Sequence, residues 1–542
     1  MRNLTKIIVM VLLCNFLKAH NQFESDLYKS DTLNFFITSA GQLCVNDSLF
    51  IHQWGLYNGT YWNTGIDIKA CNAFQLSTGH NTVVALVSTR GIDLFHPDYV
   101  NNIHPLSYQF QPFPYPPSME DPGFTPDAGI ICAEQNNYIG ISGVAPNSSL
   151  ISIKISDSFS GIADGINKAW KNGADIIFIP ESNSGYNIGL NIIETAIDSA
   201  TTFGRGGKGC VIISAIGGCN RPETFFPARL PNVLSVGAMS PCGERKRSCL
   251  YNTQLLVPCA LPDPLDTSCD SDHSWGSNYG SGLDVIAPGV HIYTTTYEFE
   301  YPPTDNNKKR IYYKEYGGTR LAASFAAGVA SLILSVNPEL THQQVRTIIE
   351  STAQKVRPDL YNYTETSGRP NGTFNLNTGY GLIDAYAAVQ AAKCFTNLPI
   401  VQGDITQNTT WNSDVHALGT IVVKNQSVLT INSVVKCQDD LIFQIEAESK
   451  IILNGTLANA CNSSPSHRNA VEIASGLIII GNGAVLNNID LIVSNNSTLS
   501  ILANCTLYLA GSSRILIEGG NLITGDNVTI NGEQGPDFFQ FI

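Results

Sequence analysis

The chain has 542 residues, of which 43% are hydrophobic and only 14% are charged, and its 31 Lys+Arg against 45 Asp+Glu give a formal net charge of −14. This length allows a large core and more than one domain. The low charge and acidic balance exclude a coiled coil and a nucleic-acid binder that works through a basic face. Mean hydropathy near zero also argues against a wholly disordered chain.

The first residues have the layout of a secretory signal peptide. Arg2 and Lys6 precede an apolar run over residues 7–17, and Ala19 follows it. About eleven apolar residues are too few to span a bilayer, and no other stretch reaches the length of a membrane helix. We therefore predict a signal peptide over residues 1–20, a lead-in segment over residues 21–80, a secreted or cell-surface protein, and no transmembrane segment.

Cysteine usage fits an exported protein. Thirteen of the fourteen cysteines remain once Cys14 is removed with the signal peptide. The cluster of Cys242, Cys249, Cys259 and Cys269 is the best candidate for disulfide bonds. A zinc site is the competing interpretation, but the spacing lacks the close C-x-x-C pairs that such a site normally shows.

Strand-like and helix-like segments alternate over residues 81–395. Short continuous apolar runs, typical of parallel strands buried on both faces, lie at residues 83–87, 150–155, 176–179, 211–215 and 233–236. Helical periodicity is present at residues 161–172, 190–203, 321–336 and 341–355, and the last of these opens with the capping pattern Thr341-x-x-Gln344. The alternation predicts an α/β domain with a parallel sheet.

The pattern changes after Cys394. Residues 399–542 have almost no helical periodicity, and short alternating strands are separated by turns rich in Asn and Gly. The strand-like runs lie at residues 419–423, 427–431, 450–453, 476–480, 491–493, 498–502, 514–517 and 527–530. They predict a second, all-β domain, either a β-solenoid, which we prefer narrowly, or a β-sandwich.

Four stretches in the first domain occur in an order that resembles the subtilisin-like serine peptidases (subtilases). They lie within residues 47–98, 128–146, 227–290 and 318–385, and they include His96-Pro97-Asp98, Gly143-Val144-Ala145-Pro146, Val285-Ile286-Ala287-Pro288-Gly289 and Gly379-Tyr380-Gly381. The resemblance implies a subtilisin-like parallel sheet flanked by helices. It also implies peptide hydrolysis by a serine nucleophile, a histidine base, an aspartate that orients the histidine, and an asparagine that donates to the oxyanion.

The matching positions hold none of these four groups. The family's aspartate falls at Ser88 or Thr89, its histidine at Gly123, and its serine at Arg320. The oxyanion asparagine falls at Gly217. A guanidinium has no usable lone pair and cannot act as the nucleophile. We therefore predict no intact catalytic residue.

Arg320 at the start of a helix faces the unfavourable end of the helix dipole, so it needs a carboxylate partner, for which Glu181, Glu315 and Asp127 are candidates. The preferred alternative is that Arg320 extends to solvent and fills the former cleft. Nearby, Pro180 removes a backbone donor that an extended peptide would use.

Three functional classes follow. The favoured one is a secreted, catalytically inactive subtilase that binds a peptide or protein ligand in the former cleft, or serves as a scaffold. The second is a serine endopeptidase with a rearranged site, which requires Ser88, Ser182 or Ser324 to meet a histidine. The third is an adhesin that contacts glycans or the cell surface through the β-rich tail.

Two further sets of residues bear on ligands and modification. Subtilisin-like folds often hold calcium, and the acidic cluster of Asp263, Asp266, Asp270 and Asp272 is either a calcium loop or, as we prefer, a solvated turn. No other cofactor is expected. Several Asn-x-Ser/Thr sites, among them Asn58, Asn371, Asn454 and Asn504, are glycan acceptors if the host has that machinery.

Overall fold

The computed structural model describes residues 44–59, 65–109, 123–182, 190–248, 270–272, 274–300, 309–396, 398–438, 441–460, 469–510, 513–532 and 539–541. The expected signal peptide, residues 1–20, lies outside the described residues. So do Cys249, Cys259 and Cys269 of the expected disulfide cluster and the two acidic residues Asp263 and Asp266.

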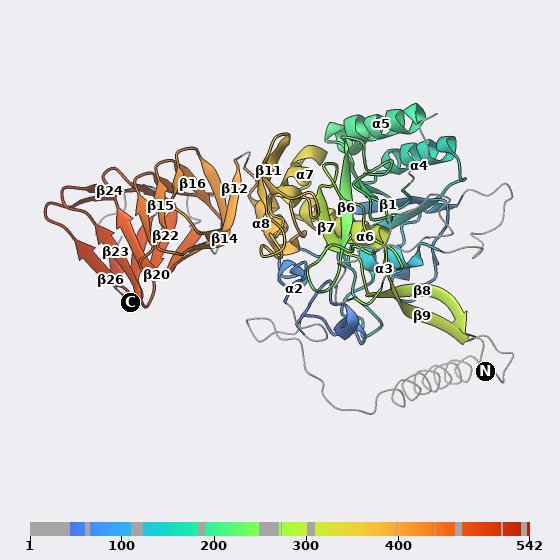
Figure 1. The fold of residues 1–542 in the computed structure, drawn as a ribbon, viewed down its shortest axis with the longest axis horizontal. Helices are drawn as coiled ribbons and strands as arrows, with labels where there is room; N and C mark the ends of the chain where they lie inside the picture. Colours follow the sequence, from blue (N-terminus) through green and yellow to red (C-terminus); the bar gives the residue numbers. More distant parts are fainter. Residues whose placement is uncertain are drawn as a thin grey trace, which may run out of the picture. The chain divides into compact units, whose positions relative to one another are not determined.

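A parallel sheet forms the centre of the first domain (Figure 1). Seven strands of the described chain pair in the order β2-β3-β1-β4-β5-β6-β7, each parallel to its neighbour. Their bounds are β1 Val83–Ser88, β2 Tyr108–Gln109, β3 Ser149–Lys154, β4 Ile176–Ile179, β5 Val211–Ala215, β6 Val233–Met239 and β7 Val285–Pro288. Every residue of β4 to β7 is buried, as continuous apolar runs require. The five strand predictions in this domain are confirmed.

Helices cover both faces of this sheet. On one face α4 (Phe159–Lys171) and α5 (Asn191–Gly207) share an apolar core with β1, β3, β4 and β5. The long helix α6 (Thr319–Val336) contacts β4 to β7. Shorter helices are η1 Phe50–His52, α2 Ala70–Ala73, η2 Val100–Asn102, α3 Thr125–Cys132, α7 His342–Ser351 and α8 Ala385–Lys393. The architecture is the predicted α/β class.

Helices α7 and α6 each account for a pattern in the sequence, a capping box and a long apolar run. The predicted capping box at α7 is present, since Thr341 N donates to Gln344 Oε1 at 2.9 Å and Gln344 N donates to Thr341 Oγ1 at 3.2 Å. In the described part of the chain, α6 alone has the length and apolar composition of a membrane span, and 83% of it is buried in the protein interior. The long apolar run is thus the core helix of this domain.

A long antiparallel hairpin precedes α6. It consists of β8 (Ile292–Glu300) and β9 (Lys309–Tyr316), and a smaller hairpin is formed by β10 (Thr364–Thr366) and β11 (Arg369–Phe374). Strand β8 packs on the first turn of α3, where Thr294 Oγ1 donates to Pro126 O at 2.9 Å and Thr295 Oγ1 donates to Thr125 O at 2.7 Å. Sequence analysis did not predict this hairpin.

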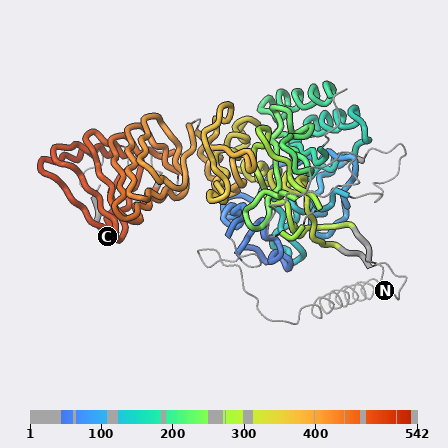
Figure 2. The backbone as a smooth tube through the Cα atoms, in the orientation of Figure 1, coloured from blue at the N-terminus to red at the C-terminus, as the bar shows by residue number. Residues whose placement is uncertain are grey.

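The tail winds in successive coils (Figure 2). Its strands pair in parallel with the strands one coil further on: Thr410 pairs with Thr430, Thr430 with Ile452, and Ile452 with Ile479. The strands are β12 Ile400–Ile405, β13 Thr409–Trp411, β14 Val415–Val423, β15 Val428–Ile431, β16 Val434–Cys437, β17 Leu441–Ile445, β18 Lys450–Leu453, β19 Thr456–Asn459, β20 Asn469–Ile480, β21 Val485–Asn487, β22 Ile489–Val493, β23 Ser497–Ile501, β24 Thr506–Ala510, β25 Arg514–Ile517, β26 Asn521–Thr524, β27 Thr529–Gly532 and β28 Phe539–Phe541. Each of the eight predicted runs overlaps one of them.

Alternate residues of the coils point inward and fill a single apolar core. At one corner, asparagines of successive coils are hydrogen-bonded in a row: Asn432 Nδ2 donates to Asn412 Oδ1 and Asn454 Nδ2 donates to Asn432 Oδ1, both at 2.9 Å. This row satisfies side-chain amides at a turn where the backbone leaves one strand and enters the next. The irregular strand spacing in the sequence reflects corners of unequal length.

Four cysteines of the described chain, Cys44, Cys71, Cys242 and Cys394, are disulfide-bonded. Cys242 belongs to the predicted disulfide cluster, so its bond supports the disulfide interpretation and leaves its thiolate unavailable as a zinc ligand.

Candidate functional site

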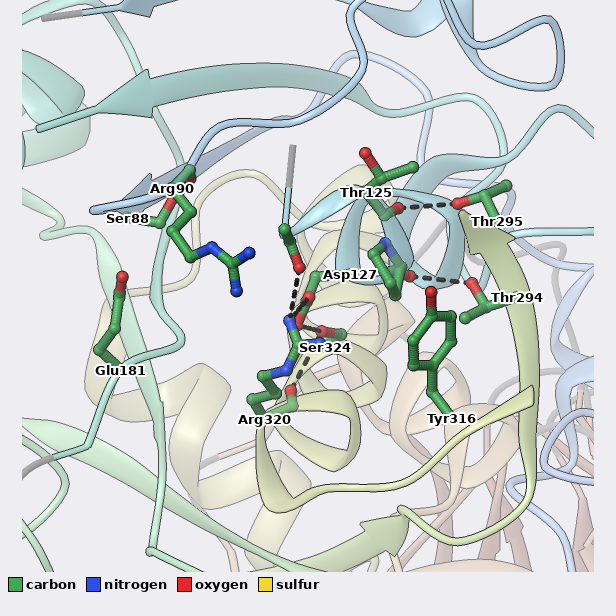
Figure 3. A network of polar contacts seen from close by, with 12 residues as sticks. Ser88, Arg90, Thr125, Asp127, Glu181, Thr294, Thr295, Tyr316, Arg320 and Ser324 are labelled. Atoms are coloured by element: carbon green, nitrogen blue, oxygen red, sulfur yellow. Dashed lines mark hydrogen bonds and ion pairs between the residues drawn. The ribbon is translucent and has the colours of Figure 1, made fainter. Parts of the chain in front are cut away.

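Three segments far apart in the sequence meet at one edge of the sheet (Figure 3). They are the end of β1 at Ser88, the residues before α3 at Gly123, and the start of α6 at Arg320. Phe124 N donates to Gly91 O at 3.1 Å, and Arg320 Nη1 donates to Gly123 O at 3.2 Å. The structure therefore brings together the three positions that sequence analysis matched to the aspartate, histidine and serine of the family.

Arg320 is held in an ion pair with Asp127 of the first turn of α3. The Asp127 carboxylate is fully buried, and it also accepts a hydrogen bond from Ser324 Oγ at 3.1 Å. The Arg320 guanidinium lies over the ring of Phe124, with 5.0 Å from Cζ to the ring centroid. The predicted pairing of Arg320 with Asp127 is confirmed, and the preferred alternative of an unpaired arginine reaching solvent is wrong. A buried carboxylate one helix away offsets the unfavourable helix dipole better than solvent does.

The two other carboxylates that were candidates for Arg320 have different partners. Glu181 Oε1 accepts from the backbone N of Thr89 at 2.6 Å and from its Oγ1 at 2.8 Å. Glu315 bonds to Nδ1 of His291 at 2.6 Å. Burial raises the pKa of Asp127 and of Glu181 above the usual range, and their hydrogen bonds and, for Asp127, the charge of Arg320 oppose this rise.

A second arginine, Arg90, occupies the space beside Gly123. A Cβ atom placed on Gly123 would lie 2.5 Å from Cζ and 2.6 Å from Nε of Arg90. Any side chain at position 123, an imidazole included, requires the Arg90 guanidinium to move. Sequence analysis did not single out Arg90, although the turn that carries it is one residue longer than the family pattern, and that extra residue was the available signal.

The serine hydroxyls considered for a rearranged site lie apart from imidazoles. Ser88 Oγ donates to Arg90 O at 2.5 Å, and Ser324 Oγ donates to Asp127 and to Arg320 O. Within the described ranges, no hydrogen bond joins Ser88, Ser182 or Ser324 to a histidine ring. In the described part of the chain, none of these hydroxyls has a histidine to take its proton, and the acceptor of Ser324 is the carboxylate that is paired with Arg320.

The loop after β5 is built around a glycine at position 217. Gly217 has φ +116°, and a Cβ there would lie 2.5 Å from the Phe225 ring and 2.6 Å from Asn278 Nδ2. Asn278 Oδ1 fixes the loop by accepting from the backbone N of Cys219 at 3.0 Å and of Arg221 at 3.1 Å. Asn220, which the sequence offered as a displaced oxyanion donor, is instead turned toward Arg245, whose Nη1 donates to Asn220 Oδ1 at 2.7 Å.

Among the described residues, no group of three or more His, Cys, Asp or Glu side chains is arranged to hold a metal ion. In the predicted acidic cluster, Asp270 pairs with the buried Lys246 at 2.9 Å, and Asp272 accepts from Trp275 Nε1 at 2.7 Å. Both carboxylates have protein partners, and Asp270 is buried, so the preferred expectation of a solvated turn is wrong for Asp270.

A different pair of carboxylates, Asp47 and Asp98, is buried near Asn137. Asn137 N donates to Asp47 at 3.1 Å, and Asn137 Nδ2 donates to Asp98 at 3.2 Å. Burial raises the pKa of Asp47 to about 6 and that of Asp98 to about 7, and the charge of Asp47 adds to the rise at Asp98. Carboxylate and amide oxygens are the ligands that calcium prefers, so the donor chemistry here fits that ion.

Comparison with known proteins identifies the family. The family model described as "Subtilase family" matches residues 79–381, more than half of the chain. This chain belongs to the subtilase family. The prediction from the sequence motifs is confirmed, and the match covers the sheet, α3, α6 and the edge at which Ser88, Gly123 and Arg320 meet.

Curated relatives of this subtilase are proteases by name. The thermophilic serine proteinase of Bacillus sp. (strain AK1) is 30% identical over 343 residues, which cover 62% of this chain and 67% of the relative. Subtilisin of Bacillus pumilus is 30% identical over 324 residues, 58% of this chain and 92% of the relative. The calcium-dependent protease of Trichormus variabilis is 29% identical over 368 residues, 63% of this chain, and the match spans only about half (51%) of the relative.

Among solved structures, the serine protease of Aeromonas sobria superposes with a TM-score of 0.51 at 18% identity. The match covers 69% of this chain and 72% of that protein. At this identity the likeness concerns the fold, and it agrees with the parallel sheet and flanking helices of this subtilase.

Proposed function

We propose that this subtilase is a secreted pseudopeptidase, which binds a peptide or protein segment in the former cleft without hydrolysing it. One observation carries the proposal: the position matched to the nucleophile holds Arg320, locked to the buried Asp127. The space beside Gly123 and the loop at Gly217 support it, since Arg90, Phe225 and Asn278 occupy the volume that a histidine or asparagine side chain would need.

The experiment is labelling of the purified mature protein with a fluorophosphonate probe for serine hydrolases, beside a peptide-cleavage assay. Subtilisin of Bacillus pumilus serves as the active control. We expect neither labelling nor turnover, because no described candidate hydroxyl is hydrogen-bonded to a histidine, and the Asp127 carboxylate that accepts from Ser324 is held in its ion pair with Arg320. Specific labelling of a serine, with turnover that is lost when that serine is replaced, would overturn the proposal.

A working serine endopeptidase is the second candidate, because the named relatives are proteases. It requires a nucleophile outside the matched positions. The same experiment decides between the two, since peptide mapping of a labelled protein would name that nucleophile.

We infer secretion from the signal-peptide pattern of residues 1–20, together with the disulfide-bonded Cys44, Cys71, Cys242 and Cys394.

We also infer that the tail is a β-solenoid, because its strands stack in parallel coils around one core. A solenoid offers a long outer surface, which suits contact with a glycan or a cell-surface partner. Deleting the tail from residue 399 and measuring cell-surface retention tests this role.

We propose that Asp47, Asp98 and Asn137 hold a calcium ion. The bound ion would cancel the repulsion between the two carboxylates and stabilise the loop that carries Asn137. The name of the calcium-dependent relative supports a role for the ion in this family.

A further inference from the structure

The guanidinium of Arg320 is fixed on one edge and open on the other. Its Nη1 makes both hydrogen bonds of the side chain, to Asp127 and to Gly123 O, and Phe124 supports the flat face. In the described part of the chain, Nε and Nη2 make no hydrogen bond, and 29% of the side chain is exposed. The Nε and Nη2 donors form the edge with which arginine binds a carboxylate through two parallel hydrogen bonds.

Binding through the Nε and Nη2 donors of Arg320 costs little conformational entropy. An arginine on a free surface loses rotamer entropy when it binds, whereas Arg320 is already held by an ion pair, a backbone carbonyl and a ring. The arrangement favours an anionic group, and specifically a planar one.

The position of Arg320 then identifies the ligand atom, on the assumption that the proposed function is correct. In an active subtilase the nucleophile attacks the carbonyl carbon of the bond that is cut. After hydrolysis that same carbon is the C-terminal carboxylate of the released peptide. An arginine in place of the nucleophile therefore faces the point where a product-like peptide would present its terminal carboxylate.

We propose that the cleft binds the free C-terminus of a peptide, with Nε and Nη2 of Arg320 donating to the two oxygens of the terminal carboxylate. Pro180, at the end of β4, supports this mode because it lacks the N–H that an extended peptide would pair with. Binding that depends less on strand pairing must depend more on a terminal anchor. A chain that continues past this point presents only a neutral carbonyl and forms the weaker hydrogen bond.

Fluorescence anisotropy with the full-length mature protein tests the proposal. The probes are fluorescein-labelled random hexapeptides without Asp or Glu, made once with a free C-terminus and once as the C-terminal amide. A third mixture is amidated and contains Glu at internal positions, so that a side-chain carboxylate can be told from a terminal one. We expect the free-acid mixture to bind at least about tenfold more tightly than either amide, as the loss of a charge-assisted bidentate contact predicts.

Variants assign the effect to the guanidinium. Arg320→Lys keeps the charge but not the paired donors, and we expect several-fold weaker binding of the free acid. The double variant Arg320→Gln with Asp127→Asn removes both charges of the buried pair, which protects the fold, and should reduce the free acid to the level of the amide. Arg514→Ala is the matched control: its side chain is 28% exposed and paired with Asp490 in the tail, and its loss should leave binding unchanged.

Equal affinity for acid and amide, tighter binding of the internal-Glu mixture, no binding of any mixture, or insensitivity to the Arg320 variants would each overturn the C-terminal site. Fluorophosphonate labelling of the same sample separates this result from the proposed function. A labelled, hydrolysing protein overturns the pseudopeptidase proposal itself, whereas an unlabelled protein that ignores the carboxylate overturns only the terminal anchor.

Discussion

Replacing Arg320 by alanine should destabilise the first domain measurably, although Arg320 lies at the edge of the sheet. Asp127 is fully buried, and without Arg320 it loses its ion-pair partner and keeps the hydrogen bond from Ser324 and one from the backbone. Leaving a buried charge without its partner costs about 3–5 kcal/mol, and the 29% exposure of Arg320 places this case near the lower limit, at about 3 kcal/mol. With roughly 2 cal/mol/K of unfolding entropy per residue and about 300 residues in the domain, Tm should fall by about 5 °C.

Scanning calorimetry of the mature protein at pH 8 and pH 5 measures this effect. The pKa of Asp127 is raised in the folded state, and removing the nearby cation raises it further, so the folded variant takes up a proton as the pH falls. Protonation removes the buried charge, and the stability lost in Arg320→Ala should therefore be partly recovered at pH 5. The double variant Arg320→Gln with Asp127→Asn, in contrast to Arg320→Ala, should have a Tm within about 2 °C of the wild type, because no buried charge remains. A Tm drop that is equal at both pH values and unchanged in the double variant would refute the reasoning.

Three further outcomes are expected. Gly217→Asn should destabilise the domain by about 2–3 kcal/mol because of its positive φ and crowded surroundings, whereas Gly123→Ala should cost about 1 kcal/mol or less since it displaces only a flexible guanidinium; thermal unfolding of both variants should give this order, and the reverse order would contradict the packing described. Because Asp47 and Asp98 have pKa values of about 6 and 7 in the fold, stability in EDTA should decrease as pH rises through that range, and calcium should raise Tm more at pH 8 than at pH 5.5; a Tm indifferent to calcium at pH 8 would remove the ion from this site. Asn432→Ala interrupts the asparagine row on both sides and should lower the stability of the tail by about 1–2 kcal/mol in urea unfolding, and an unchanged midpoint would show that solvent replaces both bonds.

The architecture was predictable because its signals are local. Continuous apolar runs such as Ile176–Ile179 and Val211–Ala215 leave few alternatives to buried parallel strands, and the capping pattern at Thr341 marks the start of a helix by itself. The hairpin of β8 and β9 was missed because its strands mix charged and aromatic residues and do not alternate cleanly. The parallel stacking of the tail was predicted only narrowly, since strand runs identify strands but not the partner with which each one pairs.

At the candidate site, motif order placed Ser88, Gly123 and Arg320 at one edge of the sheet, and the structure brings them together. Sequence alone left three carboxylates as partners for Arg320, because the choice depends on how α3 and α6 approach each other in space. The role of Arg90 was invisible for the same reason. The sequence shows that position 123 is a glycine, but only the fold shows that the Arg90 side chain fills the space beside it.

The contact between Arg90 and Gly123 and the pair of Arg320 with Asp127 also restrict how this sequence can change. A serine introduced at position 320 would leave the buried Asp127 carboxylate without its ion-pair partner. A histidine introduced at position 123 would require the Arg90 guanidinium to move. Neither change gains activity without the other. Each of these changes alone therefore lowers stability, the one at position 320 more than the one at position 123, so the two contacts make a subtilase triad harder for this sequence to reach by single substitutions.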